Sequence, residues 1–243
     1  TMTDKAATGQ IFTATVKDMA SDGRGVVVHP SGRTMFAAGV WVGECGEFRV
    51  TEVRGRIGFA DLVELTTPVP ARIAPPCRYQ GSGPDSCGGC PWQFVTYAAQ
   101  LEAKQQRVVA EMRRLGVADA VQAIWPSAKV FGYRNRAQLK TDGRVLGFVA
   151  NRTNALVPVS HCMVLDEANN LALARLQQQM PNDEWVPARR TPWTTLDINA
   201  GQGADQIGVN QRLPFMQANA GQNSRIREWL GAHLARIDPG ATV

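Results

Sequence analysis

The sequence contains no long apolar run. No stretch of its 243 residues approaches the ~18 consecutive apolar residues that a membrane-spanning helix requires. Residues 1–25 also lack the apolar segment that is typical of a secretory signal peptide. We therefore expect a cytoplasmic protein with no membrane partner, whose cysteines are kept reduced.

Paired cysteine motifs are scarce as well. Only Cys87 and Cys90 form a C-x-x-C pair, whereas a structural zinc site usually shows two such pairs. The total of five cysteines is odd, which argues against a complete disulfide framework. A thioredoxin-like redox pair usually follows an apolar strand, but a polar, Pro-containing loop precedes this one.

The chain does contain a cysteine-rich loop, from Cys77 to Cys90. Its Gly, Ser, Pro and Asp residues have little apolar surface to bury, so packing alone would not order it. Thiolates bound to a metal centre would order it, and Cys162 offers a fourth thiolate. This pattern favours an iron–sulfur cluster with four thiolate ligands. A zinc site completed by His161, and inert or redox-active thiols, stay open as alternatives.

Bulk composition sets only broad limits. The length permits one large or two modest domains, and 44% hydrophobic residues is ordinary for a globular protein. The net charge of +5 is a moderate basic excess, which gives weak support for a polyanionic partner.

Residues 11–66 are predicted to form a small β-barrel of the OB type, after a polar tail over residues 1–10. Short apolar stretches broken by glycines predict about five strands in this region: Ile11–Val16, Gly25–His29, Thr34–Ala37, Gly46–Val53 and Ile57–Leu65. Its arginines could equally form a solvated surface or contact RNA. They are Arg24, Arg33, Arg49, Arg54 and Arg56.

The rest of the chain is predicted to mix strands and helices, so that the fold class is α+β, mainly β. A Pro-rich connector follows the barrel. Apolar periodicity then predicts a helix from Phe94 to Leu115. Alternation predicts strands over Arg134–Thr141, Arg144–Ala150 and Ala155–Val159, with two more within residues 193–219. Two further helices are expected, over Asp166–Gln179 and Asn219–Ala235.

Three cations are predicted to share one face of the strand over Arg134–Thr141. Side chains alternate along a strand with period two, which places Arg134, Arg136 and Lys140 together. A row of like charges is costly unless solvent or an anion meets it. Solvent is the common solution, and an RNA backbone is the more specific one.

Four motifs occur in an order that resembles a known family. They are Cys77 with Cys87-Gly-Gly-Cys90-Pro-Trp-Gln, Gly132-Tyr133-Arg134-Asn135-Arg136-Ala137, His161-Cys162, and Phe215-Met216-Gln217-Ala218-Asn219. The chain resembles the iron–sulfur RNA (uracil-C5)-methyltransferases over nearly all of its length. One departure is the separation of Cys77 from Cys87 by nine residues, more than is usual in that family. The extra Gly-Ser-Gly-Pro-Asp-Ser is flexible enough to bulge out.

The resemblance implies roles for particular residues. Cys77, Cys87, Cys90 and Cys162 would hold a [4Fe-4S] cluster, and Cys45 would be a core thiol outside the pattern. Residues 11–66 would be a TRAM-like RNA-binding domain. Arg134, with Arg136 and Lys140, would contact RNA, and ribosomal RNA is favoured over tRNA. Phe215 would lie near the flipped target base, and Gln217 would reach S-adenosylmethionine.

Compared with the family that it resembles, the sequence lacks the residues that carry out catalysis. The Gly-rich turn that holds the cofactor, the cysteine nucleophile and the carboxylate base of the family have no counterpart in this sequence. Residues 238–243 would begin the first strand of the nucleotide-binding sheet. We therefore expect the N-terminal part of an S-adenosylmethionine-dependent methyltransferase, inactive by itself, with no catalytic residue in this chain.

The domain division expected from the resemblance has four parts. Residues 1–10 would be a tail, 11–66 the TRAM-like barrel, 67–92 with 125–213 the iron–sulfur central domain, and 93–124 with 214–243 remnants of the methyltransferase domain. The apolar faces of the helices in those remnants would be bare and would favour self-association. The alternatives are a free-standing RNA-binding iron–sulfur or zinc module without methyltransferase activity, and a zinc-stabilised interaction protein unrelated to RNA.

Overall fold

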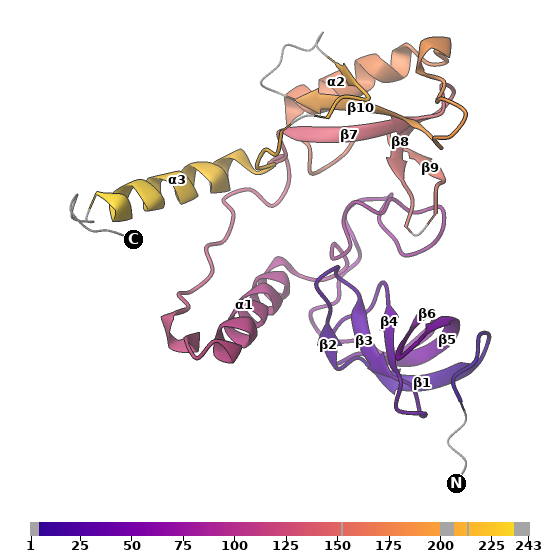
Figure 1. Ribbon diagram of the computed structural model, residues 1–243, viewed down its shortest axis with the longest axis vertical. Helices are drawn as coiled ribbons and strands as arrows, with labels where there is room; N and C mark the ends of the chain where they lie inside the picture. Colours follow the sequence, from indigo (N-terminus) through magenta and orange to yellow (C-terminus); the bar gives the residue numbers. More distant parts are fainter. Residues whose placement is uncertain (1–4, 152, 200–206, 213, 236–243) are drawn as a thin grey trace. The chain divides into compact units, whose positions relative to one another are not determined.

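The chain folds into two compact units in the computed structural model (Figure 1). The structure describes residues 5–151, 153–199, 207–212 and 214–235. The first unit runs to Ile124 and also includes the loop Ala150–Thr153, and the second comprises Trp125–Val149 and the chain from Asn154. The expected strand start at residues 238–243 lies outside the described residues.

A six-stranded sheet forms most of the first unit. Its strands are β1 (Ile11–Thr15), β2 (Asp18–Met19), β3 (Gly25–Val28), β4 (Thr34–Ala37), β5 (Cys45–Arg54) and β6 (Ile57–Thr67). They lie in the order β1-β5-β6-β4-β3-β2, and only β4 and β6 pair in parallel. Because β1 also contacts β3, the sheet curls back on itself. The five predicted strands are confirmed to within three residues at each end, and the short β2 was not predicted.

Alternation along these strands builds the core of the first unit. Val27, Met35 and Phe48 are fully buried, while the residues beside them in the chain point outward. An added Cβ on Gly58 would sit 2.9 Å from the backbone carbonyl oxygen of Glu52 and 2.3 Å from the Met35 sulfur. Because the backbone oxygen cannot move aside as a side chain can, glycine is favoured where β6 crosses this part of the core.

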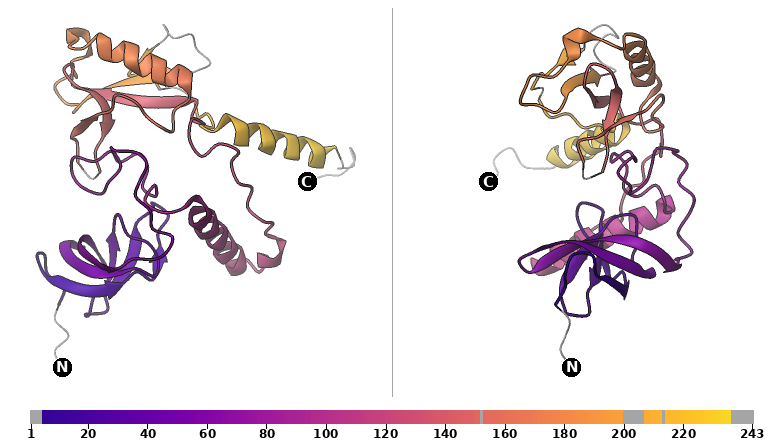
Figure 2. Two further views of the ribbon diagram at one scale, coloured as in Figure 1. Left: turned by 180° about the vertical axis from the view of Figure 1, so that it is seen from behind. Right: turned by 90° about the vertical axis from the view of Figure 1, so that its right-hand side faces the viewer.

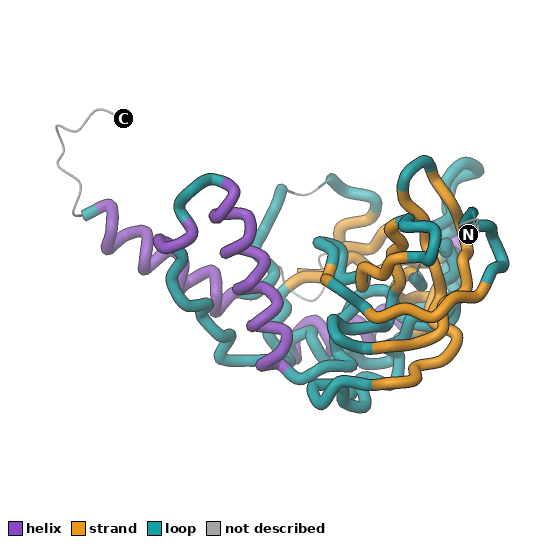
Figure 3. Tube along the Cα trace, turned by 90° about the horizontal axis from the view of Figure 1, so that it is seen from below, coloured by secondary structure: helices purple, strands orange, loops and turns teal. Residues whose placement is uncertain are grey.

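The residues between β6 and the first helix, all of them described, form loops and turns (Figure 3). A hydrophobic cluster of Trp41, Phe94 and Val95, with Trp92 packed against it, holds the end of this segment to the curled sheet. Trp92 Nε1 also donates to the carbonyl of Gly23 at 2.9 Å. The prediction that a helix begins at Phe94 is therefore wrong, because Phe94 packs in this cluster.

The helix α1 (Tyr97–Arg114) begins after the N-cap residue Thr96, whose hydroxyl accepts from the backbone N–H of Ala99. A short 3₁₀ turn over Ala118–Ala120 follows it. No side chain of α1 is buried, and Val108 is 49% exposed. The apolar face that the periodicity predicted is thus only partly covered within the first unit, where Ala99 and Ala103 pack against the hydrophobic cluster.

The second unit contains a five-stranded antiparallel sheet. Its strands are β7 (Arg136–Thr141), β8 (Leu146–Val149), β9 (Leu156–Pro158), β10 (Thr194–Asn199) and β11 (Gly208–Val209), in the order β11-β10-β7-β8-β9. The predicted meander is confirmed, except that Arg134 and Asn135 precede β7 instead of belonging to it.

The helix α2 (Glu167–Gln178) packs on one face of this sheet (Figure 2). Asp166 is its N-cap and accepts from the N–H of Asn169 at 2.9 Å. Leu173 and Leu176 of α2 are buried with Leu139 and Leu196 of the sheet. A 3₁₀ turn over Asp183–Trp185 adds a buried tryptophan side chain to the same core.

The last described helix, α3 (Ala220–Leu234), begins after the N-cap residue Asn219. None of its side chains is buried, and Leu234 is 62% exposed. Within the second unit, its start is held to Trp125, whose carbonyl accepts from the side chain of Gln222 at 3.0 Å. No helix in the described part of the chain combines the length and apolar character needed to cross a membrane.

Candidate functional site

A buried carboxylate on β10 organises the polar face of the second sheet. Arg136 Nε donates to Asp197 Oδ1 at 2.7 Å, and Nη2 donates to Asp197 Oδ2 at 3.2 Å. Gln138 Nε2 donates to Asp197 Oδ2 at 2.9 Å. The Asp197 side chain is 1% exposed and that of Arg136 is 14% exposed. Hydrogen bonding to Asp197 raises the pKa of Arg136, so this arginine is firmly charged and internally neutralised.

Arg134 is exposed and lies just before β7. Its backbone is held on both sides, by single-residue bridges to Leu165 and Asn219. The N–H of Arg134 donates to the carbonyl of Val164 at 2.8 Å, and its side-chain Nε donates to the carbonyl of Arg136 at 2.9 Å. Among the described residues Arg134 forms no ion pair, so its charge is available to an anion.

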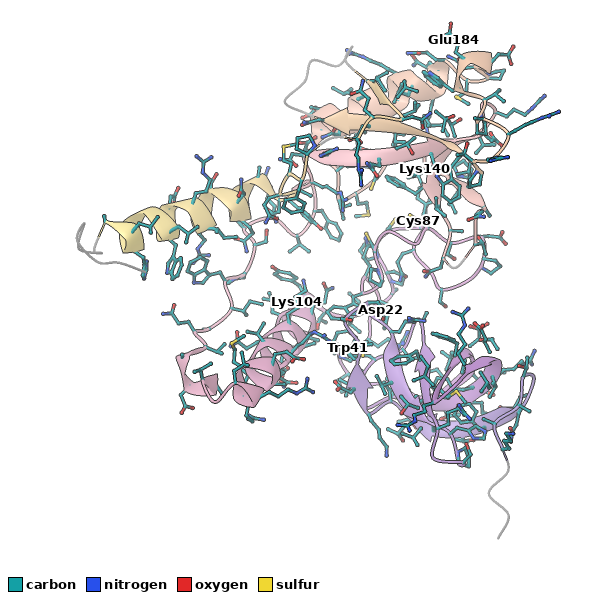
Figure 4. All side chains as sticks on the ribbon, in the orientation of Figure 1. Asp22, Trp41, Cys87, Lys104, Lys140 and Glu184 are labelled. Carbon is teal, nitrogen blue, oxygen red and sulfur yellow. The ribbon has the colours of Figure 1, made fainter. Side chains whose placement is uncertain are left out.

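Lys140 lies on β7 (Figure 4). Its side chain is on the same face of the strand as that of Arg136, because the two residues are four positions apart. Its Nζ donates to Thr195 Oγ1 at 2.7 Å. Burial lowers the pKa of the Lys140 ammonium, and the charge of Asp197 offsets this only in part. The three predicted cations are therefore not equivalent, because within the described part of the chain only Arg136 has a carboxylate partner.

Phe215 and Gln217 lie in a short segment that is anchored at two points. The carbonyl of Pro214 accepts from Arg136 Nη1 at 2.9 Å, and the carbonyl of Ala218 accepts from the N–H of Asn135 at 3.0 Å. Between these anchors Phe215 is 85% exposed and Gln217 is also exposed. An exposure this high excludes a strand-core role for Phe215. The structure thus brings together Arg134, Arg136 and the segment that carries Phe215.

The cysteine loop of the first unit is held by backbone hydrogen bonds. The N–H of Cys87 donates to the carbonyl of Tyr79 at 2.7 Å, and the N–H of Gln80 donates to the carbonyl of Cys77 at 3.0 Å. Cys87 also pairs with Ala150 in an antiparallel bridge. All five cysteines of the chain are thiols that form no disulfide, and each is partly buried.

Cys162 belongs to the second unit. Asn170 fixes its backbone, because Asn170 Oδ1 accepts from the Cys162 N–H at 2.9 Å and Asn170 Nδ2 donates to the Cys162 carbonyl at 3.0 Å. Within the described ranges, no three or more His, Cys, Asp or Glu side chains form a group that could hold a metal ion. The donor chemistry suits an iron–sulfur cluster, but the side chains are not gathered, and the cluster stays a prediction.

Two of the arginines in the curled sheet of the first unit form ion pairs with nearby carboxylates. Arg24 pairs with Asp22, and Arg54 pairs with Glu52. Both guanidinium groups also lie over the ring of Phe59, at 4.8 Å for Arg24 and 5.7 Å for Arg54. In these contacts both cations lie against side chains of the first unit, so their charges are partly offset within it.

Two residues of the polar face were missed from the sequence. Asp197 is the one charged residue of the strand Thr194–Asn199 and lies between Leu196 and Ile198, which is a usable signal for a buried partner of a cation. Trp193 comes just before this strand and lies 5.9 Å from Lys140 Nζ, measured to the ring centroid. Nothing in the local sequence links Trp193 to a residue on another strand.

Comparison with known proteins finds similar chains among RNA methyltransferases, although no family model matches. An uncharacterized RNA methyltransferase of Nitrosomonas europaea is 38% identical over 226 residues, which are 90% of this chain and 58% of that protein. The 23S rRNA (uracil(1939)-C(5))-methyltransferase RlmD of Halomonas elongata is 32% identical, over 92% of this chain and 46% of that protein. RlmD of Pseudomonas putida is 35% identical, over 62% of this chain and 34% of that protein.

The fold is similar to that of a tRNA (uracil-54, C5)-methyltransferase of Pyrococcus abyssi, solved in complex with S-adenosyl-L-homocysteine. The TM-score is 0.55 at 22% sequence identity, over 87% of this chain and 48% of that one. This likeness supports a mixed α+β fold that is mainly β. The chain spans about half the length of the proteins that it matches.

Proposed function

We propose that this chain is the RNA-recognition part of an S-adenosylmethionine-dependent RNA (uracil-C5)-methyltransferase. Its relatives are named RNA methyltransferases, and two of them are named for uracil C5 of 23S rRNA. These names favour an enzyme over a free-standing RNA-binding module. The relatives are longer than this chain, so the activity of the whole enzyme is part of the proposal.

RNA contact is supported by one structural observation above the others. The segment from Arg134 to Arg136 is hydrogen-bonded to the chain on both sides of the exposed Phe215, and Arg134 forms no ion pair among the described residues. An exposed aromatic ring and a cation on adjoining segments suit an RNA base and a phosphate. We assign phosphate contact to Arg134 and Lys140, and stacking on the target base to Phe215.

Arg136 has a positioning role in this proposal. Its guanidinium joins the buried Asp197 to the carbonyl of Pro214, which directly precedes Phe215. A neutralised arginine adds little to phosphate attraction, but it can hold the Phe215 segment in place. Gln217 is assigned to the methionyl part of the cofactor, by resemblance and by its exposure on the same segment.

Methyl transfer to C5 of uracil needs a nucleophile that makes this carbon electron-rich and a base that removes its proton. We assign neither role to a residue of this chain. Incubation of the chain with labelled S-adenosylmethionine and undermethylated ribosomal RNA is therefore expected to give no labelled uridine. Label in uridine would show that catalysis resides in residues to which we give structural or binding roles.

A [4Fe-4S] cluster held by Cys77, Cys87, Cys90 and Cys162 is the second part of the proposal. It is supported by the resemblance, by the absence of any disulfide at these thiols and by the thiolate donor set. Four thiolate ligands leave no open iron position, so the cluster would order the loop and take no part in the chemistry.

Equilibrium binding tests the proposed function directly. The chain should bind a fragment of undermethylated 23S rRNA with an affinity that falls as salt rises, because phosphate binding releases counterions. A tRNA of similar length and a double-stranded DNA serve as competitors. Lack of any binding at low salt would overturn the assignment of RNA recognition to this chain.

A further inference from the structure

Lys140 is a partly buried cation without a carboxylate of its own. Its Nζ donates to the hydroxyl of Thr195, which is neutral, and it forms no ion pair within the described ranges. The carboxylate nearby, Asp197, is already bound by Arg136 and Gln138. An ammonium that has lost water and gained no anion is electrostatically incomplete. It has two further N–H donors to offer to an anion.

The aromatic side chain of Trp193 lies close to the Lys140 ammonium. Lys140 Nζ lies over the ring of Trp193, 5.9 Å from its centroid, at the outer limit of a cation–π contact. Trp193 is partly exposed. The indole therefore keeps exposed surface on which a planar group can stack.

Among the described residues, the strands on both sides of Lys140 leave its side chain uncovered on this face of the sheet. Lys140 and Thr195 are direct neighbours across β7 and β10, and they face away from α2 because Leu139 and Leu196 face toward it. The neighbour of Lys140 on β8 is Gly147. A Cβ there would lie 1.9 Å from the carbonyl oxygen of Val157, so this position cannot carry a side chain that would cover Lys140.

We propose that Trp193, Lys140 and Thr195 form a nucleotide-binding subsite for single-stranded RNA, separate from Phe215 and the target base. The base stacks on the indole of Trp193, and its phosphate accepts from the Lys140 ammonium beside Thr195. A nucleotide carries a planar base and an anionic phosphate a few bonds apart. The base is the partner that Trp193 can stack on, and the phosphate is the anion that Lys140 has not gained. Bases in a duplex are already stacked on each other, so the ligand is single-stranded.

This inference rests on the proposed RNA-recognition function, and one experiment separates the two. A short single-stranded uridine-rich RNA is titrated into the whole chain and into the variants Trp193→Leu, Trp193→Phe and Lys140→Gln. We expect Trp193→Leu to weaken binding by about 5- to 150-fold, the range for loss of one stacked base, and Trp193→Phe to restore most of it. We expect Lys140→Gln to reduce the slope of log K against log salt by about 0.7, the value for one single-strand phosphate.

Trp125 provides a matched control. It is another tryptophan of the second unit in contact with a cation, Arg225 of α3, whose guanidinium lies 4.5 Å from its ring centroid. Trp125→Leu should leave both the affinity and the salt slope unchanged. If Trp193→Leu binds the RNA as tightly as the wild-type chain does, the subsite is wrong, but the proposed RNA recognition is unaffected. A wild-type chain that binds no RNA at all would overturn both. An unchanged salt slope in Lys140→Gln would overturn the phosphate contact even if Trp193→Leu unfolds.

Discussion

Glu44 and Arg72 form a buried ion pair that joins the curled sheet of the first unit to the connector after it. The Glu44 side chain is 1% exposed and that of Arg72 is 23% exposed. Arg72 Nε donates to Glu44 Oε1 at 2.5 Å, and Nη2 donates to Glu44 Oε2 at 2.7 Å and to the carbonyl of Gly39 at 2.8 Å. The N–H of Trp41 also donates to Glu44 Oε2 at 2.8 Å. The guanidinium also lies 4.5 Å from the ring centroid of Phe94, so the pair supports the hydrophobic cluster.

Removal of one partner of this pair should destabilise the first unit. Arg72→Met leaves the Glu44 carboxylate buried without its cation, and the expected cost is about 3 kcal/mol in the free energy of unfolding. Urea denaturation followed by tryptophan fluorescence measures it, because Trp41 and Trp92 lie beside the pair. The exposed pair Glu52–Arg54 provides the control, since Arg54→Met should change stability little. Equal effects of the two variants would contradict the role assigned to burial.

Substitutions of Arg134 and Arg136 should have different effects, the first on RNA binding and the second on stability. Arg134→Gln removes an unpaired charge, so the affinity should fall and the salt slope should flatten at unchanged stability. Arg136→Gln leaves Asp197 buried without its cation, so the free energy of unfolding should fall by about 3 kcal/mol. Binding titrations at several salt concentrations, together with denaturation curves, compare the two variants. A larger change of salt slope in Arg136→Gln than in Arg134→Gln would reverse our assignment.

The thiols should bind iron when oxygen is excluded. Protein purified anaerobically is expected to be brown, with iron approaching one [4Fe-4S] cluster per chain and little zinc. Cys87→Ser or Cys90→Ser should abolish the colour and expose the loop to proteolysis, because the loop loses its metal ligands. Cys45→Ser is the matched control and should retain the iron. Stoichiometric zinc without iron after anaerobic reconstitution would refute the cluster.

Asp142 should contribute to stability at neutral pH and lose that contribution in acid. Backbone N–H groups of Val145 and Arg144 donate to Asp142 Oδ1, at 2.7 Å and 2.8 Å, and lower the pKa of this carboxyl. Since the folded pKa lies below the unfolded value of about 3.9, the contribution is complete above that value and disappears as pH falls through the folded pKa. Asp142→Ala should therefore lower the urea midpoint at pH 7, and by less near pH 3. A deficit that grows toward acid would contradict this sign.

Most of the secondary structure could be predicted from the sequence, because it depends on short periodicities. The turn residues Pro30-Ser31-Gly32-Arg33 delimit the predicted strand Thr34–Ala37, which is β4 at its observed bounds, and the cap residues Asp166 and Asn219 mark the starts of α2 and α3. The ends that were predicted wrongly have tertiary causes. Phe94 packs with Trp41 instead of starting α1, and Arg134 is held by Leu165 and Asn219 instead of β8.

The sequence by itself determined most of the elements and the polar character of β7, since each depends on neighbours within a few residues. Only the tertiary structure decided that Phe215 is exposed and which cation of β7 is neutralised. Arg136 and Asp197 are 61 residues apart, and the register of β7 with β10 brings them together. The same register leaves Lys140 opposite a hydroxyl and near Trp193. Strand pairing between distant segments follows from the packing of the whole unit, so the local pattern does not show which cation of a strand has a carboxylate partner.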